Sequence, residues 1–161
     1  MELRSVEELM GLLHACRGAR DTPGGGGRPV DVHEHALRTA ALLRRSHPAD
    51  KELQVAGLVH GIGLLLGRGD GAGHAALAAD AVRPLLGERV SRLVRLQKHG
   101  GPLTPAEAAA FESDPLAGDA VSLRQADEAA EVAGLDAGVL EDWRTVLELV
   151  AARHARLETV D

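Results

Sequence analysis

Two histidines and an aspartate occupy positions where a helical pattern calls for apolar side chains. His35, His60 and Asp127 each fall on the apolar face of a different predicted helix. A buried ionised carboxylate is costly unless it is paired or bound to a metal, so the simplest shared reason for all three is that they meet. Two histidines and one carboxylate with open coordination positions suit iron(II), or zinc together with a water. A catalytic metal site is therefore one interpretation of these residues.

The other interpretation is that each side chain is satisfied by itself. His35 and His60 could hydrogen-bond backbone carbonyls, while Asp127 could pair with Arg124 or Arg38. A site without metal could also be catalytic, with His60 or His35 as general acid or base and Asp127 orienting the ring. The residues alone do not decide whether the site binds one metal ion or none.

The elements that carry these residues are expected to be helices. The chain has 161 residues, of which 45% are hydrophobic and only 1% aromatic. Short aliphatic side chains suit close helix packing, whereas β-sheets favour aromatic and β-branched residues. No segment shows sustained alternation of apolar and polar residues. We predict an all-α, compact helical bundle that forms one domain over residues 1–161.

Capping signals mark several of the predicted helix starts. Ser5 and Glu8 form a capping box, and Thr104-Pro105 combines a cap with a proline at the first helical position. Residues 18–29, which include four consecutive glycines, are expected to form a flexible loop. The predicted helices cover 5–17, 31–46, 50–66, 73–83, 88–98, the segment from 104, 115–131 and 139–156. The candidate site lies within about 31–131, and 139–156 is a C-terminal packing helix.

Charge and hydropathy exclude several classes of partner. The net charge is −6 and no Lys/Arg cluster is interleaved with aromatic residues, so we expect no nucleic-acid partner. The longest apolar stretch, 58–66, is too short to span a bilayer, and no basic region followed by an apolar run opens the chain. No membrane partner and a cytoplasmic location are therefore expected.

Cys16 is expected to be a small core residue. The final helix could pack within the domain or against a second copy, so a monomer or a homodimer is expected.

Four segments carry a resemblance to a known superfamily. Residues 30–40 (VDVHEHALRTA) and 56–66 (AGLVHGIGLLL) resemble the first two metal-binding helices of HD-domain proteins. Residues 100–112 (GGPLTPAEAAAFE) and 120–130 (AVSLRQADEAA) are similar to the C-terminal half of the HD-domain mixed-valent diiron oxygenases. That group includes enzymes that cleave hydroxylated aminoalkyl phosphonates, and it is related to myo-inositol oxygenase. The resemblance covers about residues 25–135.

The resemblance implies four metal ligands, His35, His60, His74 and Asp127. It also implies two irons, bridged by the aspartate that follows the second histidine. In this sequence that position is Gly61, so the His-Asp pair that names the superfamily reads His-Gly. Two like-charged ions without a bridging carboxylate lose their main electrostatic shield. We therefore expect a mononuclear or metal-free site in place of the dinuclear one.

The sequence also departs from the family pattern at positions that bind the substrate and the second metal in the family. Leu64 stands where the family's His-Asp-x-Gly-His pattern has its second histidine, and the family's tyrosine and nearby glutamate fall at about Gly26 and Arg28. The segment that carries a fourth histidine and a substrate-binding lysine in the family is short here and retains Lys98 and His99. Arg28, Lys98 and His99 are the candidate contacts of a small-molecule substrate, and an anionic one would suit them.

These features favour a divergent HD-domain small-molecule enzyme of oxygenase lineage, with one iron(II) or other divalent metal, or with none. The alternative is a catalytically inactive HD-fold pseudoenzyme that serves as a binding or partner protein. Nucleotide phosphohydrolysis usually relies on the missing aspartate and is less favoured. An enzyme is the preferred interpretation because four ligand-type residues are retained.

Overall fold

The structure, a computed structural model, describes residues 2–18, 20–21, 30–66, 74–97, 104–130 and 137–158. Over these ranges the chain is all-α, as predicted, apart from one pair of two-residue strands. The elements, in chain order, are α1 (Val6–Ala15), β1 (Arg20–Asp21), β2 (Val30–Asp31), α2 (Val32–Ser46), α3 (Lys51–Val59), η1 (His60–Ile62), α4 (Gly63–Leu66), α5 (His74–Leu86), α6 (Glu88–Arg95), α7 (Pro105–Ser113), α8 (Ala117–Ala129), η2 (Leu140–Trp143) and α9 (Arg144–Glu158).

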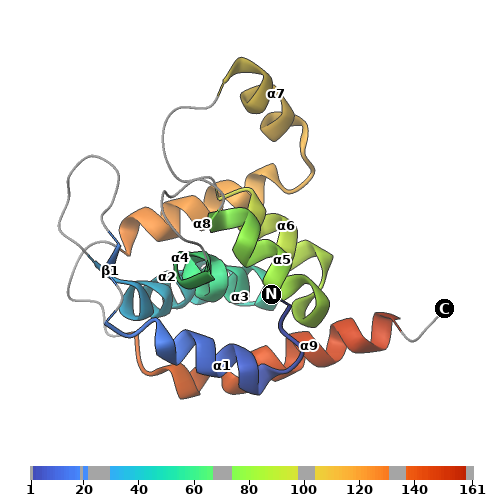
Figure 1. Cartoon of the computed structure of the whole chain (residues 1–161). Coiled ribbons are helices and arrows are strands. Elements are labelled where there is room, and N and C mark those ends of the chain that lie inside the picture. Colours follow the sequence, from blue (N-terminus) through green and yellow to red (C-terminus); the bar gives the residue numbers. More distant parts are fainter. Residues whose placement is uncertain are drawn as a thin grey trace.

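The helix α3 lies at the centre of the bundle (Figure 1). Its residues from Leu53 to Val59 are all buried, because α2, α6, α8 and α9 pack around it. Helices α1 and α9 run along one side of the bundle, and α7 stands outside it, in contact with α8 (Figure 1). A helix surrounded in this way carries its C-terminal residue, His60, into the interior.

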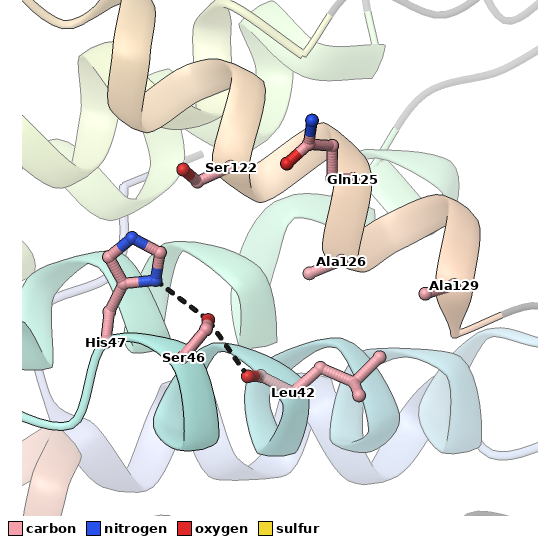
Figure 2. A pocket seen from close by; sticks show the side chains of 7 residues that line it. All are labelled: Leu42, Ser46, His47, Ser122, Gln125, Ala126 and Ala129. Atoms are coloured by element: carbon pink, nitrogen blue, oxygen red, sulfur yellow. Dashed lines mark hydrogen bonds between the residues drawn. The ribbon is translucent and has the colours of Figure 1, made fainter.

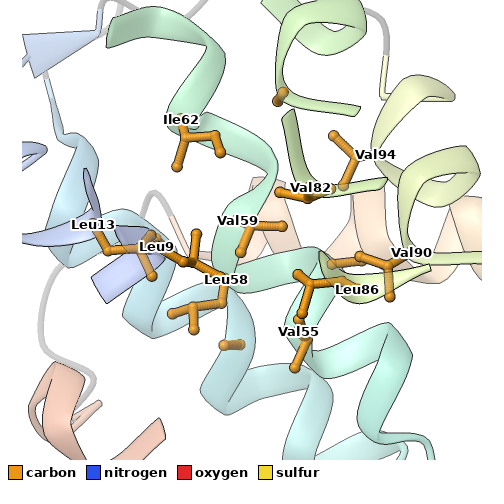
Figure 3. Close-up of a cluster of buried hydrophobic side chains, with 14 of the residues drawn as sticks. Leu9, Leu13, Val55, Leu58, Val59, Ile62, Val82, Leu86, Val90 and Val94 are labelled. Atoms are coloured by element: carbon orange, nitrogen blue, oxygen red, sulfur yellow. The ribbon is translucent and has the colours of Figure 1, made fainter. Parts of the chain in front are cut away.

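The core consists mainly of leucine, valine and alanine, as the composition predicts. Each fully buried leucine or valine side chain contributes about 1.5–3 kcal/mol relative to an exposed one. On the α9 side, Trp143 and Leu147 are fully buried, and the guanidinium of Arg44 lies 5.0 Å from the centre of the Trp143 ring. Figure 3 shows the part of the core where α1, α3, η1, α5 and α6 meet, with Leu9, Leu13, Val55, Leu58, Val59, Ile62, Val82, Leu86, Val90 and Val94.

Aspartate caps start the two helices that lead to the histidines of the site. Asp31 Oδ1 accepts a hydrogen bond from the backbone N–H of His33 at 3.0 Å, and Asp50 Oδ1 accepts one from Leu53 at 3.1 Å. Such caps satisfy donors that the first helical turn leaves free. The predicted start of α2 is thereby confirmed, and that of α3 lies within one residue of the prediction.

The helix predicted over 50–66 is wrong in its second half. The α-helical turn ends at Val59, and a 3-10 turn from His60 to Ile62 leads into the short α4. Gly61 and Gly63 are weak helix formers, and Gly63 lies directly against α5. A Cβ on Gly63 would overlap the backbone carbonyl of His74. This tertiary contact therefore decides how the chain leaves α3.

Two further differences concern element ends. The helix predicted over 73–83 extends to Leu86 with Pro84 inside it, and Gly87, at φ 97°, provides the left-handed residue that ends it. The predicted loop over 18–29 contains the strand β1, which pairs antiparallel with β2 just after the loop, with Arg20 opposite Asp31. A two-residue pairing is too short to produce an alternating pattern. Residues 22–29, with Gly26 and Arg28, lie outside the described residues.

In the part of the chain that the structure describes, no helix is both long enough and apolar enough to cross a membrane.

Candidate metal centre

The three ligand-type residues predicted from the sequence meet in the structure. His35 comes from α2, His60 opens the 3-10 turn η1 directly after α3, and Asp127 comes from α8. Their candidate ligand atoms all lie within 4.8 Å of one another. His35 Nε2 is 2.6 Å from Asp127 Oδ1, and His60 Nε2 is 2.8 Å from the same oxygen. Three helices far apart in sequence thus direct their polar atoms at one point.

The group is largely shielded from solvent. The side chains of His35, His60 and Asp127 are 13%, 4% and 21% exposed. Among the described residues this is the group of three or more His, Cys, Asp or Glu that could hold a metal ion. At this depth the polar atoms need mutual pairing or a cation to offset their lost hydration.

The second nitrogen of His60 fixes how its ring faces Asp127. His60 Nδ1 lies 2.6 Å from the backbone oxygen of Gly57, and since that oxygen only accepts, we assign the proton to Nδ1. A neutral His60 ring then points the Nε2 lone pair at a carboxylate oxygen 2.8 Å away. Such an approach requires a positive charge between the two atoms, either a proton on Nε2 or a metal ion. Histidine ligands of metals commonly donate their other ring N–H to a backbone carbonyl, so His60 fits a metal ligand.

Asp127 is held in the ionised form. Burial by itself raises the pKa of this carboxyl, but hydrogen bonds from His35 and His60, together with their charges, outweigh it and hold the pKa well below its usual range. A carboxylate that stays ionised can bind a cation at any pH at which the histidines are neutral. Binding a metal here would displace the proton that the histidine–aspartate contacts otherwise hold.

The arginines that could have neutralised Asp127 have other partners. Arg38 Nη2 pairs with Glu34 at 3.3 Å, one turn earlier on α2. The guanidinium of Arg124 lies 6.0 Å from the centre of the Phe111 ring. The structure therefore favours the interpretation in which the three residues meet over the one in which each is satisfied separately.

His35 differs from His60 in its outer contacts. Its Nδ1 is buried and has no hydrogen-bond partner among the described residues. Its backbone carbonyl accepts a hydrogen bond at 2.9 Å from the hydroxyl of Thr39, which is fully buried. The main chain at His35 is thus tied down by Thr39.

His74, the remaining predicted ligand, opens α5. The structure places its backbone against Gly63 but does not bring its ring into the group of His35, His60 and Asp127. Its Nε2 is buried and has no hydrogen-bond partner among the residues described. A role for His74 as a ligand stays a prediction. The predicted substrate contacts Arg28, Lys98 and His99 lie outside the described residues.

Gly61 sits directly after His60, in the 3-10 turn. A Cβ built on it would lie 3.2 Å from Val32 Cγ1, which is tight but involves a single methyl group. Leu64, at the other altered family position, is a partly buried residue packed against the core. Both positions therefore contribute no ligand, and their surroundings are apolar.

A shallow groove of about 250 Å³ lies between α2 and α8 (Figure 2). The sequence interpretation missed it, because its polar residues occupy ordinary exposed helix positions. Ser46 Oγ lies 2.8 Å from His47 Nδ1, and Ser122 and Gln125 face them from α8 (Figure 2). The groove uses the face of α8 that contains Ala126 and Ala129; Asp127 is not among its lining residues, so the groove and the candidate centre are separate features.

Comparison with known proteins gives one informative match. No protein-family model matches the sequence. The chain is 29% identical to a hydroxymethylphosphonate dioxygenase from Gimesia maris, and the match covers 71% of this chain and 75% of that protein. This similarity supports a general relationship to the oxygenases that the sequence motifs resemble.

Proposed function

We propose that this protein is a small-molecule enzyme of the HD-domain oxygenase lineage in which His35, His60 and Asp127 hold one divalent metal ion. Iron(II) is the first candidate because two histidines and one carboxylate suit it. The observation that carries the proposal is the contact of His60 Nε2 with Asp127 Oδ1 at 2.8 Å, while the Nδ1 proton is committed to the carbonyl of Gly57. With His60 neutral, a metal ion bound by both atoms would take the place of the proton that this contact otherwise requires.

Asp127, His60 and the helices around them would have different roles at the metal site. Asp127 would supply the negative charge that offsets the cation. His60 is oriented by the Gly57 carbonyl, and the surrounding helices keep bulk water from the three ligands. A bound iron(II) would supply the capacity to activate dioxygen and to attract an anionic substrate.

Acid–base catalysis without metal is less favoured by the same contacts. Both ring nitrogens of His60 are engaged, one by Gly57 and the other by Asp127. His35 also directs Nε2 at Asp127, and its Nδ1 is buried. Neither ring presents a free nitrogen to a substrate in this arrangement, as general acid–base catalysis requires.

One metal is proposed in preference to two. A dinuclear centre needs a carboxylate to bridge and shield two like charges, and Gly61 offers none. The substrate is proposed to be a small anion, because the similar protein is named for a phosphonate and because Arg28, Lys98 and His99 are the candidate contacts. Retention of the ligand group favours an enzyme over the pseudoenzyme alternative.

Metal content tests the proposal. Wild-type protein purified without chelator, or reconstituted with iron(II) or manganese(II), should contain one metal per chain. His60→Ala and Asp127→Ala should lose it, whereas His14→Ala, which changes an exposed histidine on α1, should keep it. Wild-type protein that stays metal-free after reconstitution would refute the proposal.

Oxygen consumption tests the reaction class. The iron(II)-loaded wild type should consume dioxygen when a small hydroxylated phosphonate, such as hydroxymethylphosphonate, is added, and Asp127→Ala should not. Equal consumption by the two proteins would mean that the three-ligand group is not the reacting site.

A further inference from the structure

Helices α2, α3 and α8 meet at Gly57, near the end of α3 and three residues before His60. A Cβ built on Gly57 would lie 2.6 Å from Leu43 Cδ1 and 3.3 Å from Thr39 Cγ2, both on α2. It would lie 3.5 Å from Leu123 Cδ1, on α8. The first distance is below any normal carbon–carbon contact, so at Leu43 α2 packs on α3 more closely than an alanine would allow without a shift, whereas the contact with α8 would be an ordinary one.

Two of these contacts lie one helical turn from a ligand. Thr39 follows His35 by one turn, and its hydroxyl donates to the His35 carbonyl at 2.9 Å. Leu123 precedes Asp127 by one turn of α8, so the two share a face of that helix. A shift of either helix at this level is therefore transmitted to its ligand.

Gly57 is also joined to the third ligand by a direct contact. Its carbonyl oxygen accepts the Nδ1 proton of His60 at 2.6 Å. Gly57 thus allows the close approach of α2 and orients the His60 ring that follows α3.

We propose that Gly57 is a positioning residue for the metal site: the absence of its side chain sets the spacing between α2 and α3 at which His35 and His60 converge on Asp127. This inference rests on the proposed function of the site. Leu43 and Thr39 are fully buried, so little free space surrounds them. An added methyl group must displace the Leu43 side chain against its packed neighbours or move α2 away from α3.

The decisive variant is Gly57→Ala, and the chain provides a matched control. Gly118 also lies in a helix, α8, and a Cβ built on it has nothing within 4 Å. Gly118→Ala adds the same methyl group without moving a helix. Cobalt(II) titration of the metal-free proteins, read by the visible absorption of the bound ion, gives the affinity and reports the ligand geometry.

We expect Gly57→Ala to bind cobalt(II) about 10-fold more weakly or worse, with altered visible bands, as for other changes beside metal ligands. Gly118→Ala should keep the affinity within about twofold, since it touches no ligand. The double variant Gly57→Ala/Leu43→Val removes about the volume that the alanine adds. It should restore most of the affinity and the wild-type bands.

The outcomes separate this inference from the proposed function. If wild-type protein binds no cobalt(II), both are refuted. If wild type binds one ion and Gly57→Ala binds it equally well, the positioning role alone is wrong. A lower unfolding temperature with unchanged affinity of the folded protein also refutes it, because that result describes packing only. If Gly57→Ala does not fold, the double variant decides: wild-type affinity supports the inference, and loss of binding in a folded double variant contradicts it.

Discussion

Arg89 on α6 links the N-terminus of α3 to α8, and its replacement should destabilise the fold measurably. Its guanidinium contacts both carboxylate oxygens of Asp50 at 2.8 Å. It also lies 3.3 Å from Glu52 Oε1 and 3.0 Å from Asp119 Oδ2. Because α3 leads to His60 and α8 carries Asp127, this ion-pair cluster holds two of the ligand-bearing helices in register.

The magnitude follows from the geometry and burial of the cluster. The side chains of Arg89 and Asp50 are 29% and 27% exposed, so the bidentate pair is mostly shielded. Breaking a buried pair costs about 3–5 kcal/mol, and partial solvation reduces this. We expect Arg89→Met, which keeps the apolar stem, to lower the free energy of unfolding by about 2–3 kcal/mol. At roughly 2–4 °C per kcal/mol, the unfolding temperature should fall by about 4–12 °C.

The loss should depend on pH in a defined direction. The hydrogen bonds from Arg89 lead the effects that hold the pKa of Asp50 below its ordinary value, against the opposing effect of burial. A carboxyl with a lowered folded-state pKa stabilises the fold fully above its unfolded pKa of about 3.9. That contribution disappears as the pH falls from there through the folded-state pKa. The difference between wild type and Arg89→Met should therefore be constant from neutral pH down to about 5 and shrink at lower pH.

Urea unfolding followed by circular dichroism at a series of pH values measures this difference. Arg83→Met is the control, because the Arg83–Glu88 pair is 63% and 59% exposed. It should change the free energy of unfolding by less than about 0.5 kcal/mol. Equal losses in the two variants, or a difference that grows on acidification, would refute the reasoning.

Three further predictions follow from single positions. Gly63→Ala should prevent stable folding, seen as loss of a cooperative thermal transition, because its Cβ would overlap the His74 carbonyl. Burial raises the pKa of the Cys16 thiol to about 11, so a thiol reagent at pH 8 should react with native protein roughly 100-fold more slowly than with urea-unfolded protein. Gly61→Asp places a carboxylate beside His60, and a rise from one to two ions per chain would support the oxygenase lineage; displacing Val32 should cost only about 1 kcal/mol in the free energy of unfolding.

Each of these predictions has a control and a contradicting result. Gly118→Ala should melt like the wild type, and a Gly63→Ala protein of wild-type stability would mean that the helices are not in contact there. Equal reaction rates of native and unfolded Cys16 would show that the thiol is accessible. Gly61→Ala adds the methyl group without the carboxylate and should keep one metal, so a second ion bound to it would exclude the bridging role of Asp at this position.

The sequence predicted the candidate site because buried polar residues interrupt an apolar pattern. Helical periodicity alone placed His35 and Asp127 on inward faces, and the structure brings both to His60. The starts of α2 and α3 were predictable as well, since Asp31 and Asp50 act through the adjacent backbone. Caps and helical periodicity depend on residues close together in the sequence, so they can be predicted from the sequence alone.

What the sequence could not predict depends on contacts between distant segments. The helix break at His60 follows from the approach of Gly63 to α5, about which the spacing of apolar residues says nothing. The close contact at Gly57 likewise requires knowing that α2 and α8 both pack against α3. His74 was assigned by resemblance alone, and the position of its ring depends on how α5 packs.

Stoichiometric titration of the metal-free protein with cobalt(II) tests the central claim most directly. The account predicts one end point at one ion per chain, with visible bands that are absent in His35→Ala, His60→Ala and Asp127→Ala. An end point at two ions per chain, or no bound cobalt(II), would contradict it.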